Sequence, residues 1–144
     1  MNVSQLYERD FYAWAMKMAH ALKARDIEQL DFDHLSEELE DMGVSQEREM
    51  ESRLTVLIMH LLKWEHQPTY QSKSWSLTIK EQRRKIARRL KKTPSLKAKI
   101  EEMLDDVYGD AILAAQKETG LAESEFPACL PYTLAQLLDD EFYP

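Results

Sequence analysis

Residues 50–64, with the sequence MESRLTVLIMHLLKW, decide the fold of this chain. Apolar residues recur here every three or four positions, which is the spacing of one face of an α-helix. They are Met50, Leu54, Leu57, Leu61 and Trp64. In the second half of the stretch other apolar residues fill the remaining faces, namely Val56, Ile58, Met59 and Leu62. A helix that is apolar almost all round is expected only where other helices surround it. We therefore predict a central, most buried helix here, which ends before Pro68.

The same spacing extends toward the N-terminus. A first helix carries an aromatic and apolar stripe that consists of Tyr7, Phe11, Trp14, Met18 and Leu22. A second helix, with Asp31 or Asp33 as its cap, carries Leu35, Leu39 and Met42. Gly43 lies where a helix commonly ends in a left-handed residue, and Ser45 can start the next helix. One helix through Gly43 also fits the spacing, but we expect a break or kink there.

Downstream, the sequence predicts two more long helices and a tail. Trp75, Ile79, Ile86 and Leu90 mark the fourth helix, in which Thr78 and Glu81 form a capping box if it begins late. Pro94 ends this helix or opens the next one, which runs from Ser95 to a cap at Gly120. Residues 121–132 are expected to form an extended tail anchored by its aromatic residues. Thr133 is expected to cap a short last helix.

No stretch alternates apolar and polar residues as a half-buried strand does, so the predicted class is all-α. The simplest architecture is an antiparallel helical bundle of four to five main helices with the extended tail and the short last helix. Without a repeat or a Gly/Ser linker, residues 1–144 are predicted to form a single domain. The single Cys129, the charged residues 8–10 and the shortness of the longest apolar run predict a cytoplasmic protein that does not associate with membranes.

Charge is strongly segregated along the chain. Residues 73–99 contain eleven Lys and Arg against Glu81 alone, a net charge of +10, which leaves −17 for the remainder of a chain whose net charge is −7. Residues 31–51 contain nine acidic residues against Arg48, a net charge of −8.

Three interpretations fit the basic segment. In the one we favour, it packs beside the acidic residues of the same chain or of a symmetric partner. In the second it binds nucleic acid, with Trp75 stacking on an unpaired base. In the third it binds an acidic protein. The candidate phosphate or partner contacts are Lys80, Arg84, Arg88 and Arg89. The overall negative charge argues against a polyanion, so we expect little oligonucleotide binding at 0.15 M salt.

Signatures of catalysis are sparse. One helix flank carries His34, Glu38 and Asp41, with Glu37 nearby. Metal sites in helical bundles typically use Glu-x-x-His pairs, and the sequence has none. We therefore predict no metal or cofactor. His60 is expected to be buried and hydrogen-bonded to a carboxylate or a carbonyl. Cys129 is expected to be a buried structural residue. The sequence has no phosphate-binding glycine loop and no nucleophile elbow.

Several motifs in order resemble the bacterial α-helical family catalogued as domain of unknown function twenty-nine. They are Glu37-Glu38-Leu39-Glu40-Asp41-Met42-Gly43, His60-Leu61-Leu62-Lys63-Trp64, Ser74-Trp75, Gln82-Arg83-Arg84, Glu118-Thr119-Gly120-Leu121 and Cys129-Leu130-Pro131-Tyr132. The resemblance runs from about Tyr7 to Pro144. It implies a stand-alone helical domain and no particular activity. It also implies a shared polar cluster or buried network at Glu37, Glu38, Asp41, His60, Trp75, Gln82 and Arg83.

The leading functional hypothesis is therefore a non-enzymatic helical protein that acts by binding another macromolecule, an unknown protein partner, or a second copy of itself. The first alternative is a metal-dependent hydrolase or nuclease in which Glu37, Glu38, Asp41 and His60 hold a divalent ion. The second is a nucleic-acid-binding module that uses residues 73–99.

Overall fold

The computed structural model describes every residue from Met1 to Pro144. The chain is 79% helical, contains six α-helices and has no strand, so the predicted all-α class is confirmed. Contacts between residues divide the chain into two compact units, Met1–Gln46 and Glu47–Pro144. The single domain over residues 1–144 stays a prediction. None of the helices is both long and apolar enough to cross a membrane.

The N-terminal unit contains α1 (Val3–Arg9), α2 (Phe11–Ala24), a short 3-10 turn (Ile27–Gln29) and the beginning of α3. The predicted first helix is two helices because Asp10, with φ −150° and ψ 85°, lies outside the helical region. The backbone N–H of Asp10 bonds to Leu6 and ends α1, while its carboxylate accepts a hydrogen bond from the Ala13 N–H and caps α2.

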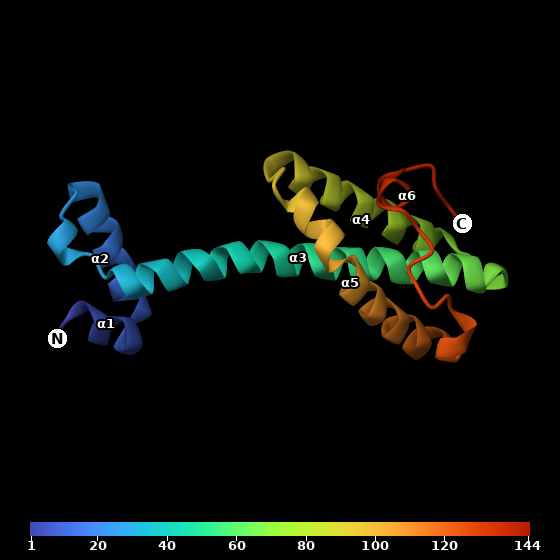
Figure 1. Ribbon diagram of the computed structural model, residues 1–144, viewed down its shortest axis with the longest axis horizontal. Helices are drawn as coiled ribbons and strands as arrows, with labels where there is room; N and C mark the ends of the chain where they lie inside the picture. The colour runs from blue at the N-terminus through green and yellow to red at the C-terminus, as the bar shows by residue number, and fades with distance from the viewer. The chain divides into compact units, whose positions relative to one another are not determined.

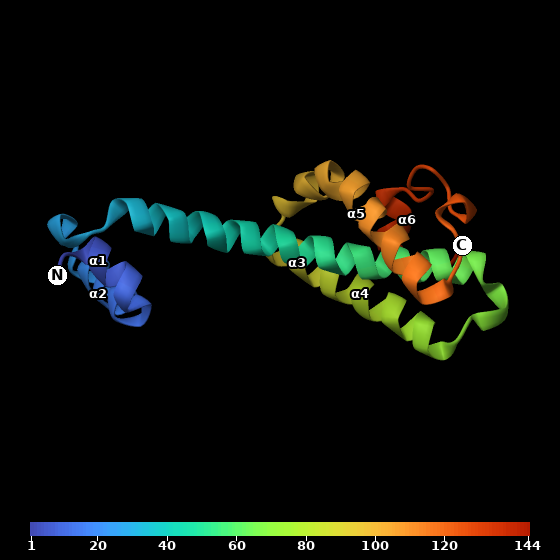
Figure 2. The same cartoon turned by 90° about the horizontal axis from the view of Figure 1, so that it is seen from below.

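One helix, α3, runs without interruption over Phe32–His66 (Figures 1 and 2). The expected break at Gly43 is therefore wrong. The only residues with a positive φ are Arg25 and Gly120, so Gly43 keeps a helical backbone. A glycine inside a helix costs only about 0.5–1 kcal/mol relative to alanine, and the helical turns on both sides outweigh that cost.

The C-terminal unit is a bundle around the second part of α3. There α4 (Lys73–Lys92) runs back along α3, and α5 (Leu96–Thr119) turns again (Figures 1 and 2). The short α6 (Leu134–Leu138) follows a tail that contains a 3-10 turn at Glu123–Glu125, and α6 contacts α4.

Local signals set most of the helix ends in this unit. Gly120, at φ +74°, ends α5 in the left-handed conformation, and Thr133 forms a capping box with Gln136 at α6, as predicted. The cap of α4 is Ser72 rather than Thr78, so α4 begins before the position at which a capping box would form.

The core of the C-terminal unit confirms the predicted central helix. Leu54, Leu57, Ile58, Leu61 and Leu62 have no exposed surface. They pack against apolar residues of α4, α5 and α6, and the tail aromatics Phe126 and Tyr132 are buried against the same core.

Candidate functional site

The seven predicted polar positions fall in both units. Glu37, Glu38 and Asp41 lie on α3 in the N-terminal unit, whereas His60, Trp75, Gln82 and Arg83 lie in the C-terminal unit. No three His, Cys, Asp or Glu side chains are grouped so that they could hold a metal ion. The hydrolase alternative, which needs Glu37, Glu38, Asp41 and His60 together, therefore has no assembled ligand set.

In the N-terminal unit, polar and aromatic side chains fasten the first two helices to the start of α3. The Nδ1 of His34 donates to Asp31 Oδ2 at 2.7 Å, and the Trp14 indole donates to the same oxygen at 3.1 Å. Tyr7 stacks on the His34 ring with centroids 3.8 Å apart and donates its hydroxyl to Glu38 at 2.5 Å. Glu38 thus belongs to a polar network, while Glu37 and Asp41 are exposed.

Protonation in this network follows from the hydrogen bonds. Burial disfavours the Asp31 carboxylate, but the hydrogen bonds from His34 and Trp14 outweigh burial and lower the pKa of Asp31. The hydrogen bond to Asp31 raises the pKa of His34. The hydrogen bond to Glu38 raises the pKa of Tyr7 to about 12, so the phenol stays protonated at neutral pH.

The network does not form a catalytic triad. The Ser4 hydroxyl lies 3.5 Å from His34 Nδ1, the same nitrogen that bonds to Asp31. A general base must face the nucleophile with one ring nitrogen and the orienting carboxylate with the other. The arrangement therefore holds the helices together and does not activate the serine.

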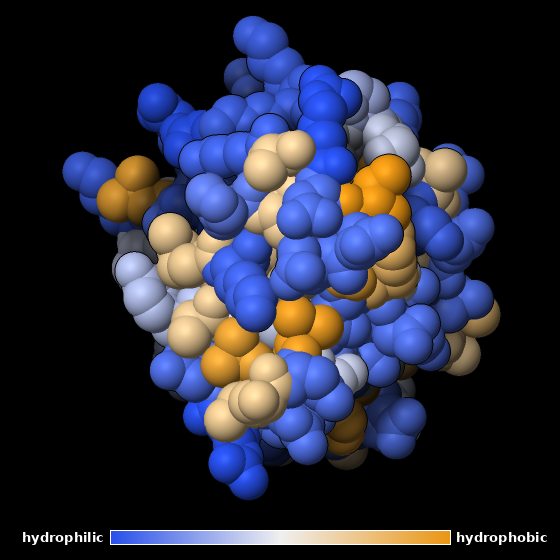
Figure 3. All heavy atoms as spheres, turned by 90° about the vertical axis from the view of Figure 1, so that its left-hand side faces the viewer, coloured by the Kyte–Doolittle hydropathy of each residue, from blue (hydrophilic) through white to orange (hydrophobic).

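An apolar groove lies beside this network, between α2 and the beginning of α3. Its lining residues are Phe11, Trp14, Ala15, Met18, Ala19, Leu22, Leu35, Glu38 and Leu39. Trp14 and Met18 are buried, whereas Phe11, Leu22 and Leu39 are half-exposed or more. On the molecular face that carries α1 and α2, apolar atoms gather near the middle among hydrophilic ones (Figure 3).

His60 and Trp75 have structural partners. The Nδ1 of His60, which is half-buried, donates to the Val56 carbonyl at 2.8 Å, and burial lowers the pKa of His60. The Lys63 ammonium lies 4.4 Å from the centre of the Trp75 ring and forms an ion pair with Glu118. Because Lys63 covers one face of Trp75, the ring is already engaged in a cation–π contact.

Arg83 is the most buried charged side chain, with 2% of its surface exposed. Its Nε donates to the Leu137 carbonyl at 2.8 Å, and its Nη2 donates to the Gln136 carbonyl at 3.2 Å. Both carbonyls lie at the end of α6, where helical N–H donors run out: Gln136 also accepts the Asp139 N–H at 3.3 Å, whereas Leu137 has no backbone donor. Arg83 therefore ties α6 to α4.

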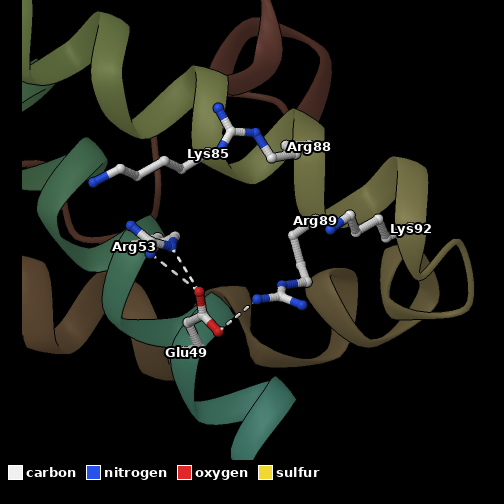
Figure 4. A pocket seen from close by; sticks show the side chains of 6 residues that line it. All are labelled: Glu49, Arg53, Lys85, Arg88, Arg89 and Lys92. Carbon is white, nitrogen blue, oxygen red and sulfur yellow. Dashed lines mark hydrogen bonds and ion pairs between the residues drawn. The ribbon is translucent and has the colours of Figure 1, made fainter.

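A basic pocket with a volume of about 130 Å³ opens between α3 and α4 (Figure 4). We define it by its lining residues, which are Glu49, Arg53, Lys85, Arg88, Arg89 and Lys92. Glu49 lies between two guanidinium groups. Oε1 accepts from Nε and Nη2 of Arg53, both at 3.1 Å, and Oε2 accepts from Arg89 Nη2 at 3.0 Å. These hydrogen bonds, led by that of Arg53, lower the pKa of Glu49.

The expected pairing of the basic and acidic segments is realised at one carboxylate. Of residues 47–51, which belong to the C-terminal unit, only Glu49 forms an ion pair with the basic segment. Lys85 pairs with Glu81 and Lys99 pairs with Glu102, so three of the eleven basic residues have an acidic partner. Of the four candidate contacts, Lys80, Arg84 and Arg88 are exposed, and Arg89 faces Glu49.

Cys129 corrects a prediction, because its side chain is exposed and its thiol is free. In the tail the aromatic side chains Phe126 and Tyr132 take the buried positions instead. The Tyr132 hydroxyl is anchored to Glu65 at 2.7 Å.

Comparison with known proteins adds one finding to this geometry. A family model described as "Domain of unknown function DUF29" matches residues 6–143 of the 144-residue chain. The chain belongs to this family. The match confirms the resemblance that the motifs indicate. No curated protein and no solved structure matches the chain.

Three features of this DUF29 protein escape prediction from the sequence. The first is the pairing of His34 with Asp31 and Tyr7, and the second is the role of Arg83 at α6. The third is the basic pocket. Its only indication in the sequence is the spacing of Glu49 and Arg53, because residues four apart on a helix can form an ion pair.

Proposed function

We propose that this protein acts through macromolecular interaction and that its N-terminal unit binds a helix of a partner protein. The partner helix is basic and amphipathic. It lies in the apolar groove between α2 and α3, with its cations facing the acidic residues of α3.

The distribution of exposed apolar side chains carries this proposal. Of the fourteen large hydrophobic residues that are exposed, ten lie in residues 1–46, which make up about a third of the chain. They are Met1, Phe11, Tyr12, Met16, Leu22, Ile27, Phe32, Leu39, Met42 and Val44. Three of the ten, Phe11, Leu22 and Leu39, line the groove. Single exposed apolar residues are ordinary, but several that line one groove are typical of an interaction surface.

The groove has the chemistry that helix-in-groove recognition uses. The small residues Ala15 and Ala19 lie between Phe11 and Leu22 on α2 and leave room for a partner helix to approach closely. On the opposite side, Leu35 and Leu39 recur on α3 at helical spacing. The bound helix would bury its apolar stripe against these side chains, which are otherwise in contact with water.

Charge favours a basic partner over a second copy of the chain. Residues 1–46 contain ten Asp and Glu against four Lys and Arg, a net charge of −6. Glu37, Glu40 and Asp41 are exposed on α3 near the groove. Two copies of this unit would bring like charges together, whereas a basic helix would neutralise them.

A designed amphipathic helix of leucine and lysine is the probe for a binding test. We expect it to bind the protein in fluorescence anisotropy, and the same peptide with glutamate for lysine to bind much more weakly. Leu22→Ser combined with Leu39→Ser removes exposed groove contacts and should weaken binding roughly tenfold or more, because each leucine contributes about 1.5–3 kcal/mol when fully buried.

Leu77→Ser combined with Leu113→Ser is the matched control. These leucines are similarly exposed but belong to the C-terminal unit, so binding should be unchanged. Equal losses in both double variants would contradict a specific groove. A dimer in sedimentation velocity that Leu22→Ser and Leu39→Ser abolish would replace the partner helix by a second copy.

A further inference from the structure

The basic pocket between α3 and α4 holds more positive charge than its surroundings neutralise. Five of its six lining residues are cationic, against the carboxylate of Glu49 in the lining and that of Glu81, which pairs with Lys85 from outside it. Arg88 and Lys92 are exposed and form no ion pair. Five like charges around one hollow repel one another, so an anion that enters it relieves the repulsion.

The pocket lies between two helices, and each of them places its charged lining residues on one face at helical spacing. On α3, Glu49 and Arg53 are one turn apart, and on α4, Lys85, Arg88, Arg89 and Lys92 cover two turns of one face. Arg53 approaches from α3 and Arg89 from α4, with the α4 lysines and Arg88 around them (Figure 4).

Glu49 positions the guanidinium groups without saturating them. It engages Nε and Nη2 of Arg53 and Nη2 of Arg89. The only other bond of Arg53 is a long one, 3.5 Å, from Nη1 to Gln82. The other N–H groups of Arg89 and all those of Arg88 have no protein acceptor among the hydrogen bonds of the structure. Planar guanidinium groups with free N–H pairs match the oxygens of phosphate groups.

We infer that this pocket is a binding site for the di- or triphosphate group of a small ligand. The net charge of its lining is +4, or +3 when the Glu81 that pairs with Lys85 is counted, and this matches a compact group of several phosphates better than it matches one carboxylate or one sulfate. The site lies wholly within the C-terminal unit and is independent of the groove that we assign to a partner helix.

A compact ligand suits the pocket better than a nucleic acid does. Five cations line one small hollow of about 130 Å³, which suits a compact phosphate group rather than a chain that runs along the surface. The chain as a whole carries a charge of −7, which opposes the approach of a long polyanion. A small ligand makes all its contacts inside the pocket, where the local charge is positive.

Calorimetric titration with inorganic triphosphate, in magnesium-free buffer at 0.15 M salt, tests the inference. We expect saturable binding of triphosphate and much weaker binding of orthophosphate. Arg88→Ala combined with Lys92→Ala should weaken triphosphate binding about 100-fold, because a charge-assisted contact is worth about tenfold. Both residues are exposed, so this variant should keep the wild-type melting temperature.

Lys73→Ala combined with Lys97→Ala is the matched control, because it removes the same charge at exposed positions outside the pocket. This variant should bind triphosphate within about twofold of the wild type, since distant surface charges are screened. The inference is overturned if the wild type does not bind triphosphate, if orthophosphate binds equally well, or if both double variants lose affinity equally. A DNA oligonucleotide that binds more tightly than triphosphate, with equal losses in both variants, would make α4 a nucleic-acid surface instead.

Discussion

Replacing Arg83 with methionine should detach α6 from the bundle. The side chain has 2% of its surface exposed and donates hydrogen bonds to the carbonyls of Leu137 and Gln136 at 2.8 and 3.2 Å. Methionine can fill much of the same apolar space, but it leaves both carbonyls without these donors. Leu137 itself has no exposed surface, so water does not readily replace the lost partner at its carbonyl.

The size of the effect follows from two opposing terms. A hydrogen bond from a charged donor contributes about 1.5–3 kcal/mol, and two are lost. Removing a buried cation returns part of its desolvation cost, which offsets some of this loss. We expect a net loss of about 2–3 kcal/mol. For a unit the size of Glu47–Pro144 this corresponds to a fall in melting temperature of roughly 10–20 °C.

Urea denaturation measures the loss of stability, and hydrogen exchange shows where it acts. Amides of residues 134–138 should lose protection before the core of α3 does. Arg84→Met is the matched control, because the neighbouring Arg84 is exposed and its replacement should change stability by no more than about 0.5 kcal/mol. If Arg83→Met were as stable as the wild type, with residues 134–138 still protected, the anchoring role of Arg83 would be refuted.

The remaining predictions concern protonation, glycine and the free thiol. In an NMR titration the pKa of His34 should lie above 6.5, because its hydrogen bond to Asp31 stabilises the protonated ring. The pKa of His60 should lie below 6.5, because burial disfavours its protonated form. The reverse order would contradict both environments. By linkage, the stabilisation from His34 is complete below about pH 6.5 and is lost as the pH rises through the raised pKa of His34. The stabilisation from neutral His60 is present above about pH 6.5 and is lost as the pH falls through the lowered pKa of His60. Amide protection near the two histidines should therefore change in opposite directions with pH. Gly43→Ala should raise the free energy of unfolding by about 0.5–1 kcal/mol, because an added Cβ at this helical position meets no atom within 4 Å. Gly120→Ala should lower the free energy of unfolding by about 1 kcal/mol, because φ at this position is +74°. If urea denaturation ranks the two variants the other way, the continuous helix through Gly43 is contradicted. A thiol reagent should modify Cys129 in the folded protein about as fast as in urea, and strong protection would show that the side chain is buried.

Features that depend on near neighbours in the chain were predictable. The apolar spacing in 50–64 identifies the central helix because 3.6 residues complete a turn, whatever the helix packs against. Gly120 and Thr133 act as caps through bonds to residues at most four positions away, so their roles are visible in the sequence. Family membership was also predictable, since the motifs are short and occur in order.

Features that depend on distant residues were not predictable. Arg83 and Glu38 were singled out as polar positions, but their partners lie 54 and 31 residues away in the chain. Glu49 and Arg89, which form the basic pocket, are 40 residues apart. Gly43 was ambiguous, because the local signal permits both a cap and a helical residue, and the turns on either side decide between them.

The sequence by itself determined the all-α class, the central helix of the core, the ends of α5 and α6, and the separation of acidic from basic segments. These follow from side-chain period, capping chemistry and charge, all of which act over a few residues. Only the tertiary structure decided the division into two compact units, the continuity of α3, the exposure of Cys129 and the sites themselves. The physical reason is that burial and pairing depend on the rotation and register at which helices pack, and those are set by the combined contacts of residues far apart in the chain.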